Sequence, residues 1–160
     1  MEWNVLNENF NALIKQLFHA KEWESRADAA KQLGLLRDGR AVNLLCRALK
    51  SERDNSVIIR IIEALGRIGS GKATLRIIEK LKDETDKDEF DKRTVLTIIE
   101  SLMRIKDKRA LPHLSKFLTI KFEEIRQMTE KAFNEIEPRW NEIINEAERK
   151  KTIEEIFKSY

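Results

Sequence analysis

The 160-residue chain is poor in the residues that build tight turns, disulfide frameworks and membrane spans. It has five glycines, two prolines and one cysteine, and aromatic residues make up 7% of it. One cysteine excludes an internal disulfide framework and a four-cysteine zinc site, and so few glycines and prolines argue against many tight turns. No apolar run approaches the roughly 18 residues of a membrane-spanning helix. The chain does not start with a basic segment and an apolar core, so we expect no signal peptide and a cytoplasmic location.

The residues that are abundant favour a folded, helical protein. Hydrophobic residues make up 41% of the chain and charged residues 37%. This apolar share is too high for a disordered chain, and a domain of this length needs no disulfide or metal in order to fold. Lys, Glu, Leu and Ile also form helices readily. We therefore predict an all-α protein, and the Lys/Glu enrichment is typical of a thermophile.

Three segments of the chain repeat one pattern, in which two apolar, helix-like stretches are joined by a short polar turn. The markers of the repeat are Gly34, Gly66 and Met103 in the first stretch and Ala41, Ala73 and Ala110 in the second. Both series of markers are spaced by 32 and then by 37 residues. Because neither stretch can bury its apolar face alone, the repeated helix pairs are expected to stack into a solenoid.

The segments outside these three copies fit the same plan. Residues 125–147 form a weaker fourth copy, and five extra residues near Asp83–Asp91 predict a solvated acidic loop rather than a calcium site. Residues 3–18 match a second helix that caps the first copy. The apolar face of this cap is predicted to consist of Trp3, Leu6, Phe10, Leu13, Ile14 and Leu17. Thr152 and Glu155 are placed as the capping box of a short closing helix.

The predicted architecture is an all-α, α-α superhelix (α-solenoid) of about four helix pairs with a helical cap at each end. We expect one domain over residues 1–160. Residues 1–20 would form the N-terminal capping helix, residues 21–149 the four helix pairs, and residues 150–160 the C-terminal helix.

The pattern resembles HEAT repeats, and more closely the short variety found in bilin-lyase-like HEAT proteins. The matching motifs are Arg26 eight residues before Gly34, Ala64-Leu65-Gly66, Ala41-Val42, Ala110-Leu111-Pro112, and Ile125-Arg126 eight residues before Asn134. The resemblance covers about residues 20–149 and implies an α-solenoid. It implies no single activity, because such repeats serve scaffolds, adaptors, nucleic-acid binders and a few enzymes.

Positive charge is concentrated on the second helix of each copy. Residues 39–50, 71–82 and 108–119 each carry a net charge of +3, although the whole chain carries only +3. The resemblance implies that the second helices line the concave face of the solenoid. A basic concave face would attract an anionic partner.

Seven residues of these helices are the candidate partner-binding residues: Arg40, Asn43, Arg47, Arg76, Lys80, His113 and Lys116. Two alternatives remain open for the basic residues. Arg40, Lys72 and Arg109 share one repeat position, where a basic residue can instead form a structural ladder between copies. The other four cations could belong to a merely solvated face.

No motif points to catalysis, a cofactor or a bound metal. His19 and His113 lack neighbouring ligands, Cys46 has the spacing of a small buried residue, and no Gly-rich phosphate loop is present. We therefore predict a non-catalytic scaffold or interaction module that binds another, acidic protein. The alternative is nucleic-acid binding by the same residues, and the resemblance alone suggests a third possibility, a bilin-lyase-like enzyme or chromophore chaperone. The oligomeric state is not predicted.

Overall fold

The computed structural model describes residues 2–158, in which the regular secondary structure is helical and no strand occurs, and this confirms the predicted all-α fold class. The α-helices are α1 (Glu2–His19), α2 (Trp23–Leu36), α3 (Ala41–Ser51), α4 (Asn55–Ile68), α5 (Thr74–Thr85), α6 (Lys92–Ile105), α7 (Leu111–Leu114), α8 (Glu123–Ile136) and α9 (Trp140–Lys158). Three short 3-10 helices accompany them: η1 (Gly71–Ala73), η2 (Lys108–Ala110) and η3 (Ser115–Thr119).

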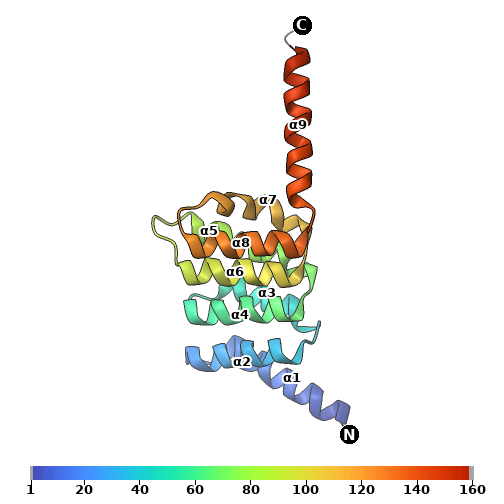
Figure 1. Cartoon of the computed structure of the whole chain (residues 1–160). Helices are drawn as coiled ribbons and strands as arrows, with labels where there is room; N and C mark the ends of the chain where they lie inside the picture. Colours follow the sequence, from blue (N-terminus) through green and yellow to red (C-terminus); the bar gives the residue numbers. More distant parts are fainter. Residues whose placement is uncertain (1, 159–160) are drawn as a thin grey trace.

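The helices form two layers. Figure 1 shows α2, α4, α6 and α8, the first layer, stacked one above the other in front of α3, α5 and α7. These last three, with α1 and the adjoining 3-10 helices, form the second layer. Neighbouring helices pack more extensively in the first layer than in the second. One hydrophobic core runs through the stack, and Leu33, Leu65 and Leu102 are fully buried in it at equivalent repeat positions.

Glycine sets the close spacing of the first layer. A Cβ atom added to Gly34 would lie 2.7 Å from Cα of Ala64 in the next helix, and one added to Gly66 would lie 2.8 Å from Cα of Ser101. Both distances are too short for a carbon contact, because backbone atoms cannot move aside as a side chain can. The glycines that mark the repeat in the sequence are therefore the points where α2 meets α4 and α4 meets α6.

The helix ends of the first layer also follow the repeat. Arg37, Gly69 and Lys106 end α2, α4 and α6 in the left-handed conformation, with φ values of 50°, 76° and 58°. At the other end, the carboxylate of Asp54 accepts from the N–H of Ser56 (2.8 Å) and caps α4. Left-handed ends and side-chain caps satisfy backbone groups that a helix terminus leaves without partners.

Arginines tie the two outer helices of the first layer to the turns before them. Nη1 of Arg26 donates to the carbonyl of Ala20 (3.0 Å), and Nη1 of Arg126 donates to the carbonyl of Ile120 (3.1 Å). Arg26 also binds Glu52 through two hydrogen bonds, Nε to Oε2 (2.8 Å) and Nη2 to Oε1 (3.2 Å). The arginine position noted in the sequence therefore has the same structural role in the first and the fourth copy.

The acidic segment Asp83–Asp91 differs from the solvated loop predicted for it. Helix α5 continues to Thr85, and the side chain of Glu84 is only 1% exposed. One oxygen of this carboxylate accepts from the N–H of Asp91 (2.7 Å), and the other pairs with Nζ of Lys87 (2.6 Å). The prediction is wrong for Glu84 because a buried carboxylate with these partners organises the loop.

The second helix of the third copy is interrupted. The expected helix over 108–119 is a short α-helix, α7, between the 3-10 helices η2 and η3. Pro112 lies in the first turn of α7, where its missing N–H is tolerated. The whole run η2–α7–η3 occupies the place of α3 and α5 in the second layer (Figure 1).

The N-terminal cap uses only part of its predicted apolar face. Phe10, Leu13 and Leu17 of α1 are buried, Ile14 packs against them, and Leu6 is 55% exposed. The side chain of Trp3 lies outside the described residues. The second half of α1 therefore covers the first copy, and its first half extends past it (Figure 1).

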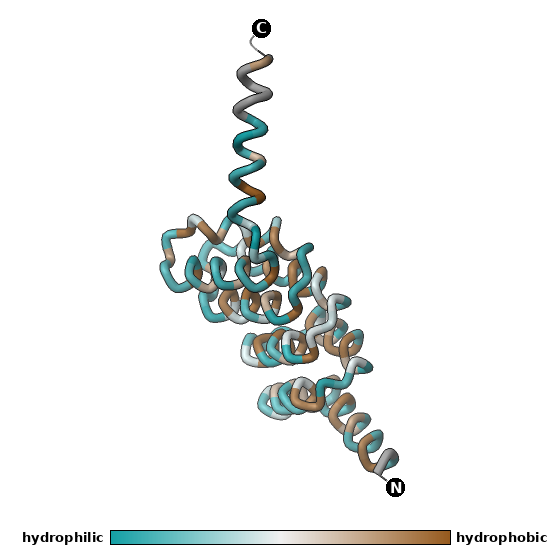
Figure 2. Tube along the Cα trace, turned by 45° about the vertical axis from the view of Figure 1, so that its right-hand side comes forward, coloured by the Kyte–Doolittle hydropathy of each residue, from teal (hydrophilic) through white to brown (hydrophobic). Residues whose placement is uncertain are grey.

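Helix α9 is one continuous helix and has no boundary between residues 149 and 150, where the sequence predicted one. Its start contacts the body, with the centre of the Trp140 ring 5.1 Å from that of the Phe133 ring. Ile143 (50% exposed) and Ile144 (41%) do not pack as residues of a fourth helix pair would. Figure 2 shows that α9 is mainly hydrophilic and stands clear of the body. A helix without one continuous apolar stripe has no face to pack against its neighbours. The side chains of Thr152 and Glu155, the predicted capping box, lie outside the described residues.

Candidate partner-binding face

The outward surface of the second layer is formed by exposed and half-buried residues of its three central elements. We call this surface the second-layer face. Its residues are Asn43, Arg47 and Lys50 on α3, Leu75, Arg76, Glu79 and Lys80 on α5, and Pro112, His113 and Lys116 on η2–α7–η3. Six of the seven predicted partner-binding residues belong to this face, and Arg40 lies at the turn beside it.

On α3, Asn43 and Arg47 are exposed and four residues apart, so they share one side of the helix. The guanidinium carbon of Arg47 lies 5.8 Å from the centre of the Phe18 ring, a contact that orients the side chain over α1. No carboxylate pairs with Arg47 among the described residues. Its charge is therefore available to a partner.

On α5, Arg76 and Lys80 differ in how their charges are used. Arg76 is ion-paired with Glu79 one turn away, whereas Lys80 has no carboxylate partner in the described chain. Both line a groove of about 280 Å³ between α3 and α5, with Lys50 on the other side. The structure thus brings Arg76 and Lys80 together with Lys50, which was not among the seven predicted residues.

Arg40 has the structural role that the sequence left open for it. Its Nη2 pairs with Oδ2 of Asp38 (2.6 Å), its Nη1 donates to the side chain of Asn7 in α1 (2.9 Å), and its guanidinium carbon lies 4.6 Å from the centre of the Phe10 ring. These contacts fix the turn between α2 and α3 to the capping helix.

Arg109 repeats this arrangement two copies later. It pairs with Asp107 (2.6 Å) and donates to the carbonyl of Gly71 in the preceding copy (2.9 Å), while Asp107 accepts from Oγ1 of Thr74 (2.8 Å). The hydrogen bond from Arg109, helped by that of Thr74 and opposed by burial, lowers the pKa of Asp107 to about 2. The ladder interpretation thus fits Arg40 and Arg109, but no such contact involves Lys72 among the described residues.

His113 and Lys116 extend the face to the third copy. His113 is half-buried on α7, and Lys116 is exposed on η3 with its Nζ 3.2 Å from Oγ1 of Thr85. Lys116 has no carboxylate partner in the described chain. The distribution of unpaired cations therefore spans all three central copies.

An exposed leucine lies among these cations. Leu75 of α5 is 56% exposed and occupies the same repeat position as Asn43 and Pro112. The candidate residues chosen from the sequence are all polar or charged, so they do not include this leucine. The repeat register would have found it, since its counterparts in the other copies both face outward.

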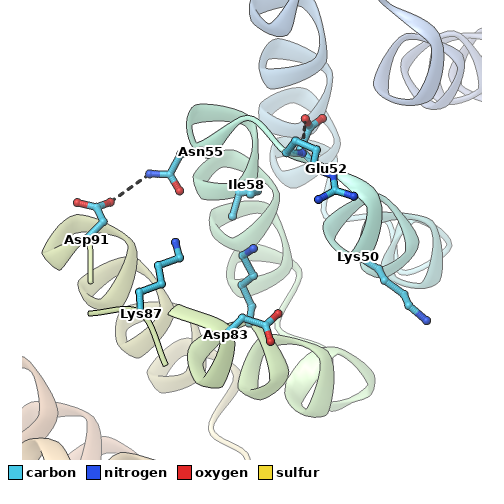
Figure 3. A pocket seen from close by; sticks show the side chains of 9 residues that line it. Lys50, Glu52, Asn55, Ile58, Asp83, Lys87 and Asp91 are labelled. Atoms are coloured by element: carbon cyan, nitrogen blue, oxygen red, sulfur yellow. Dashed lines mark hydrogen bonds between the residues drawn. The ribbon is translucent and has the colours of Figure 1, made fainter. Parts of the chain in front are cut away.

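The groove continues into a hollow of about 380 Å³ at one edge of the solenoid, which we call the end hollow (Figure 3). It is lined by Lys50, Glu52, Arg53, Asn55, Ile58, Lys80, Asp83, Lys87 and Asp91. Arg53 and Lys87 were missed because charges were counted helix by helix, and both of these residues lie in turns. Lys50, Lys80 and Asp83 also line the groove, so the two cavities adjoin.

The geometry gives no support for chemistry at the other singled-out residues. Cys46 is half-buried, and burial raises the pKa of its thiol despite the opposing charge of Arg76, which disfavours the nucleophilic thiolate. His19 is exposed on α1. No group of three or more His, Cys, Asp or Glu side chains that could hold a metal occurs in the described residues. Nor is any described helix long and apolar enough to cross a membrane.

Comparison with known protein families agrees with this architecture. A family model of HEAT repeats matches residues 10–90, from the middle of α1 to the loop before α6, which is half of the chain. No curated protein matches the chain. HEAT repeats generally mediate contacts between proteins and are typically non-catalytic. On the strength of the family match and the stacked helix pairs, the chain belongs to the HEAT-repeat family.

Proposed function

We propose that the protein is a single α-solenoid domain, residues 1–160, that acts without catalysis by binding an acidic segment of another protein on its second-layer face. One observation carries the proposal. Arg47, Lys80 and Lys116, on three successive elements of the second layer, have no carboxylate partner among the described residues, and the middle element also carries the exposed Leu75.

The arrangement has the physical properties of a recognition surface. Unpaired cations attract an anionic partner and speed its encounter, whereas a cation that is already paired contributes little. Leu75 offers an apolar contact of the kind that fills the centre of an interface, within a polar rim. The expected ligand is therefore an acidic segment that carries at least one large apolar side chain. Stacked helices hold these groups in place before binding, which reduces the entropy lost in the complex.

Nucleic acid is less well matched to this face. A phosphate backbone would be attracted by the same charges, but non-specific single-strand binders also stack bases on aromatic side chains. No exposed aromatic residue occurs among those that define the second-layer face.

Fluorescence anisotropy with three labelled probes tests the proposal. The probes are an acidic peptide with a central leucine, a DNA duplex and a single-stranded oligonucleotide, each titrated across a salt series. We expect the peptide to bind and to bind less tightly as salt rises, and neither nucleic acid to compete with it. Salt-sensitive nucleic-acid binding without peptide binding would contradict the proposal and would indicate that the face binds the phosphate backbone of nucleic acid.

A pair of matched triple variants assigns any binding to the face. Arg47→Glu, Lys80→Glu and Lys116→Glu together should abolish peptide binding and leave the helical circular dichroism unchanged. The control, Lys31→Glu, Arg93→Glu and Lys131→Glu, makes the same change in net charge at exposed positions of the first layer. Equal loss of binding in both triple variants would mean that only net charge matters, and that the second-layer face is not the site.

A further inference from the structure

The end hollow has a different composition of charge from the second-layer face. It lies where the turn between α3 and α4 meets the end of α5 and the loop before α6 (Figure 3). Four cations and three carboxylates line it. What the hollow can bind depends on which of these charges are already satisfied.

Two of the three carboxylates are engaged with the protein. Glu52 accepts both hydrogen bonds from Arg26. Burial opposes a low pKa for Glu52, but the hydrogen bonds from Arg26 and from backbone N–H groups outweigh it and lower the pKa. Asp91 caps α6, accepting from N–H (3.1 Å) and Oγ1 (2.6 Å) of Thr94 and from the amide of Asn55 (3.1 Å). Only Asp83 has no hydrogen-bond or ion-pair partner among the described residues.

The cations are less completely neutralised. The Arg53 guanidinium and the Lys80 ammonium have no carboxylate partner in the described chain. Lys87 reaches into the hollow near Asn55 and Asp91 (Figure 3) and is ion-paired with the buried Glu84. Lys50 lies at the rim, with its ammonium directed away from Lys87 (Figure 3). Arg53 and Lys80 are therefore the lining cations that point to an anionic ligand.

We propose that the end hollow binds a phosphate monoester, carried by a phosphorylated side chain of the partner that lies along the adjoining groove. This inference rests on the proposed function, and it adds that phosphorylation of the partner strengthens the complex. A phosphate monoester brings a charge of about −1.5 to −2 at pH 7 and three acceptor oxygens. It can therefore accept from the Arg53 fork and from the Lys80 ammonium together, which a single carboxylate cannot do as fully. A hollow of about 380 Å³ also has room for the side chain that carries the phosphate.

Two labelled acidic peptides that differ at one residue, phosphoserine or glutamate, test the inference by anisotropy. We expect the full-length protein to bind the phosphopeptide about tenfold more tightly, as charge-assisted hydrogen bonds to a dianion predict. The preference should grow from pH 5.5 to 7.5, because the phosphate takes its second charge near pH 6 and no histidine lines the hollow.

Two arginine variants with the same change in charge separate the hollow from the face. Arg53→Ala should remove the preference for phosphate and leave the affinity for the glutamate peptide within twofold. Arg47→Ala should weaken both peptides equally, because Arg47 belongs to the face but does not line the hollow. Equal affinity of the native protein for the two peptides, or full preference in Arg53→Ala, overturns the inference while leaving the proposed function intact.

Inorganic phosphate provides a test that needs no peptide. In a nitrogen-15 NMR titration at constant ionic strength, we expect saturating shifts at the amides of Arg53, Asn55 and Lys87, and none in Arg53→Ala. If neither peptide binds, the proposed function fails and this titration alone decides the inference. Saturating shifts would retain the hollow as a site for free phosphate, and their absence would reject it.

Discussion

The two layers of the solenoid differ in how they use small and charged residues. In the first layer, glycine lets backbones touch at Gly34 and Gly66, and several charged side chains pair with one another, as Arg104 does with Glu100 and Lys106 with Glu135. In the second layer, neighbouring helices touch less, and Arg47 has no carboxylate partner in the described chain. The difference teaches that contacts within the first layer fix the geometry of the stack. The outward side chains of the second layer are not needed for that packing and can serve to bind a partner.

The largest expected effect comes from filling a contact in the first layer. Gly66→Ala would place a Cβ 2.8 Å from Cα, Cβ and Oγ of Ser101. We expect a loss of about 2 kcal/mol in the free energy of unfolding, because overpacking strain exceeds the helix propensity gained from alanine. Chemical denaturation followed by circular dichroism measures it.

Two further variants show whether the loss comes from that contact. Gly39→Ala has no atom within 4 Å of the new Cβ and should leave stability unchanged or slightly higher. Ser101→Gly combined with Gly66→Ala removes the side-chain part of the clash and should recover some of the loss. An equally stable Gly66→Ala protein would contradict the role assigned to glycine in the first layer.

The second prediction concerns Asp107, which joins two copies through Arg109 and Thr74. Asp107→Asn should cost about 1 kcal/mol at pH 7, because it weakens a capping carboxylate and its charged hydrogen bonds. In the folded protein its pKa is about 2, below the ordinary value of 3.8, so the charged form stabilises the fold. That stabilisation is fully present above about pH 5 and is lost as the pH falls toward 2.

Denaturation curves of both proteins between pH 2 and pH 7 check this linkage. The difference in stability between the native protein and Asp107→Asn should be constant from pH 5 to 7 and should shrink below pH 4. A difference that does not depend on pH would mean that the Asp107 charge does not contribute.

The sequence predicted the repeated elements well because the same spacing of apolar residues and turns recurs in each copy. The turns at Arg37, Gly69 and Lys106 keep the 32- and 37-residue intervals of the markers, so their positions followed from the repeat. The course of α9 could not be predicted from the repeat, because Ile143 and Ile144 have helical spacing whether or not a neighbouring helix covers them. Whether an apolar stripe is buried depends on the surface that it meets, and the sequence of the helix itself does not reveal that surface.

The candidate site was predicted less completely for a similar reason. Charge counting found Arg47 and Lys80, but it treated the ion-paired Arg76 as equal to them. Arg53 lies in a turn, and it lines the hollow only because the packing of two copies places it beside α5 and the loop before α6. Which cations are paired is a property of the folded surface, and composition alone does not determine it.

A third, smaller effect is expected at the left-handed helix ends. Arg37 and Lys106 adopt positive φ without being glycine, whereas Gly69 fills the equivalent position between them. Arg37→Gly should raise the free energy of unfolding by about 0.5 kcal/mol, because relief of the left-handed strain slightly exceeds the entropy cost of glycine. Thermal melts at pH 7 would detect the gain, and a lower melting temperature would show that the Arg37 side chain has a stabilising contact.

The smallest effect on stability is expected on the second-layer face, although the effect on binding there is expected to be large. Arg47→Ala with Lys116→Ala removes two exposed cations that have no carboxylate partner in the described residues, so the free energy of unfolding should change by less than about 0.5 kcal/mol. Removing two like charges also relieves repulsion on the second-layer face, and that gain should disappear in high salt. The measurement is a pair of denaturation curves at low and high salt. A loss above 1 kcal/mol would show that these cations hold the second layer together, and the contrast between a structural first layer and a recognition surface on the second would then fail.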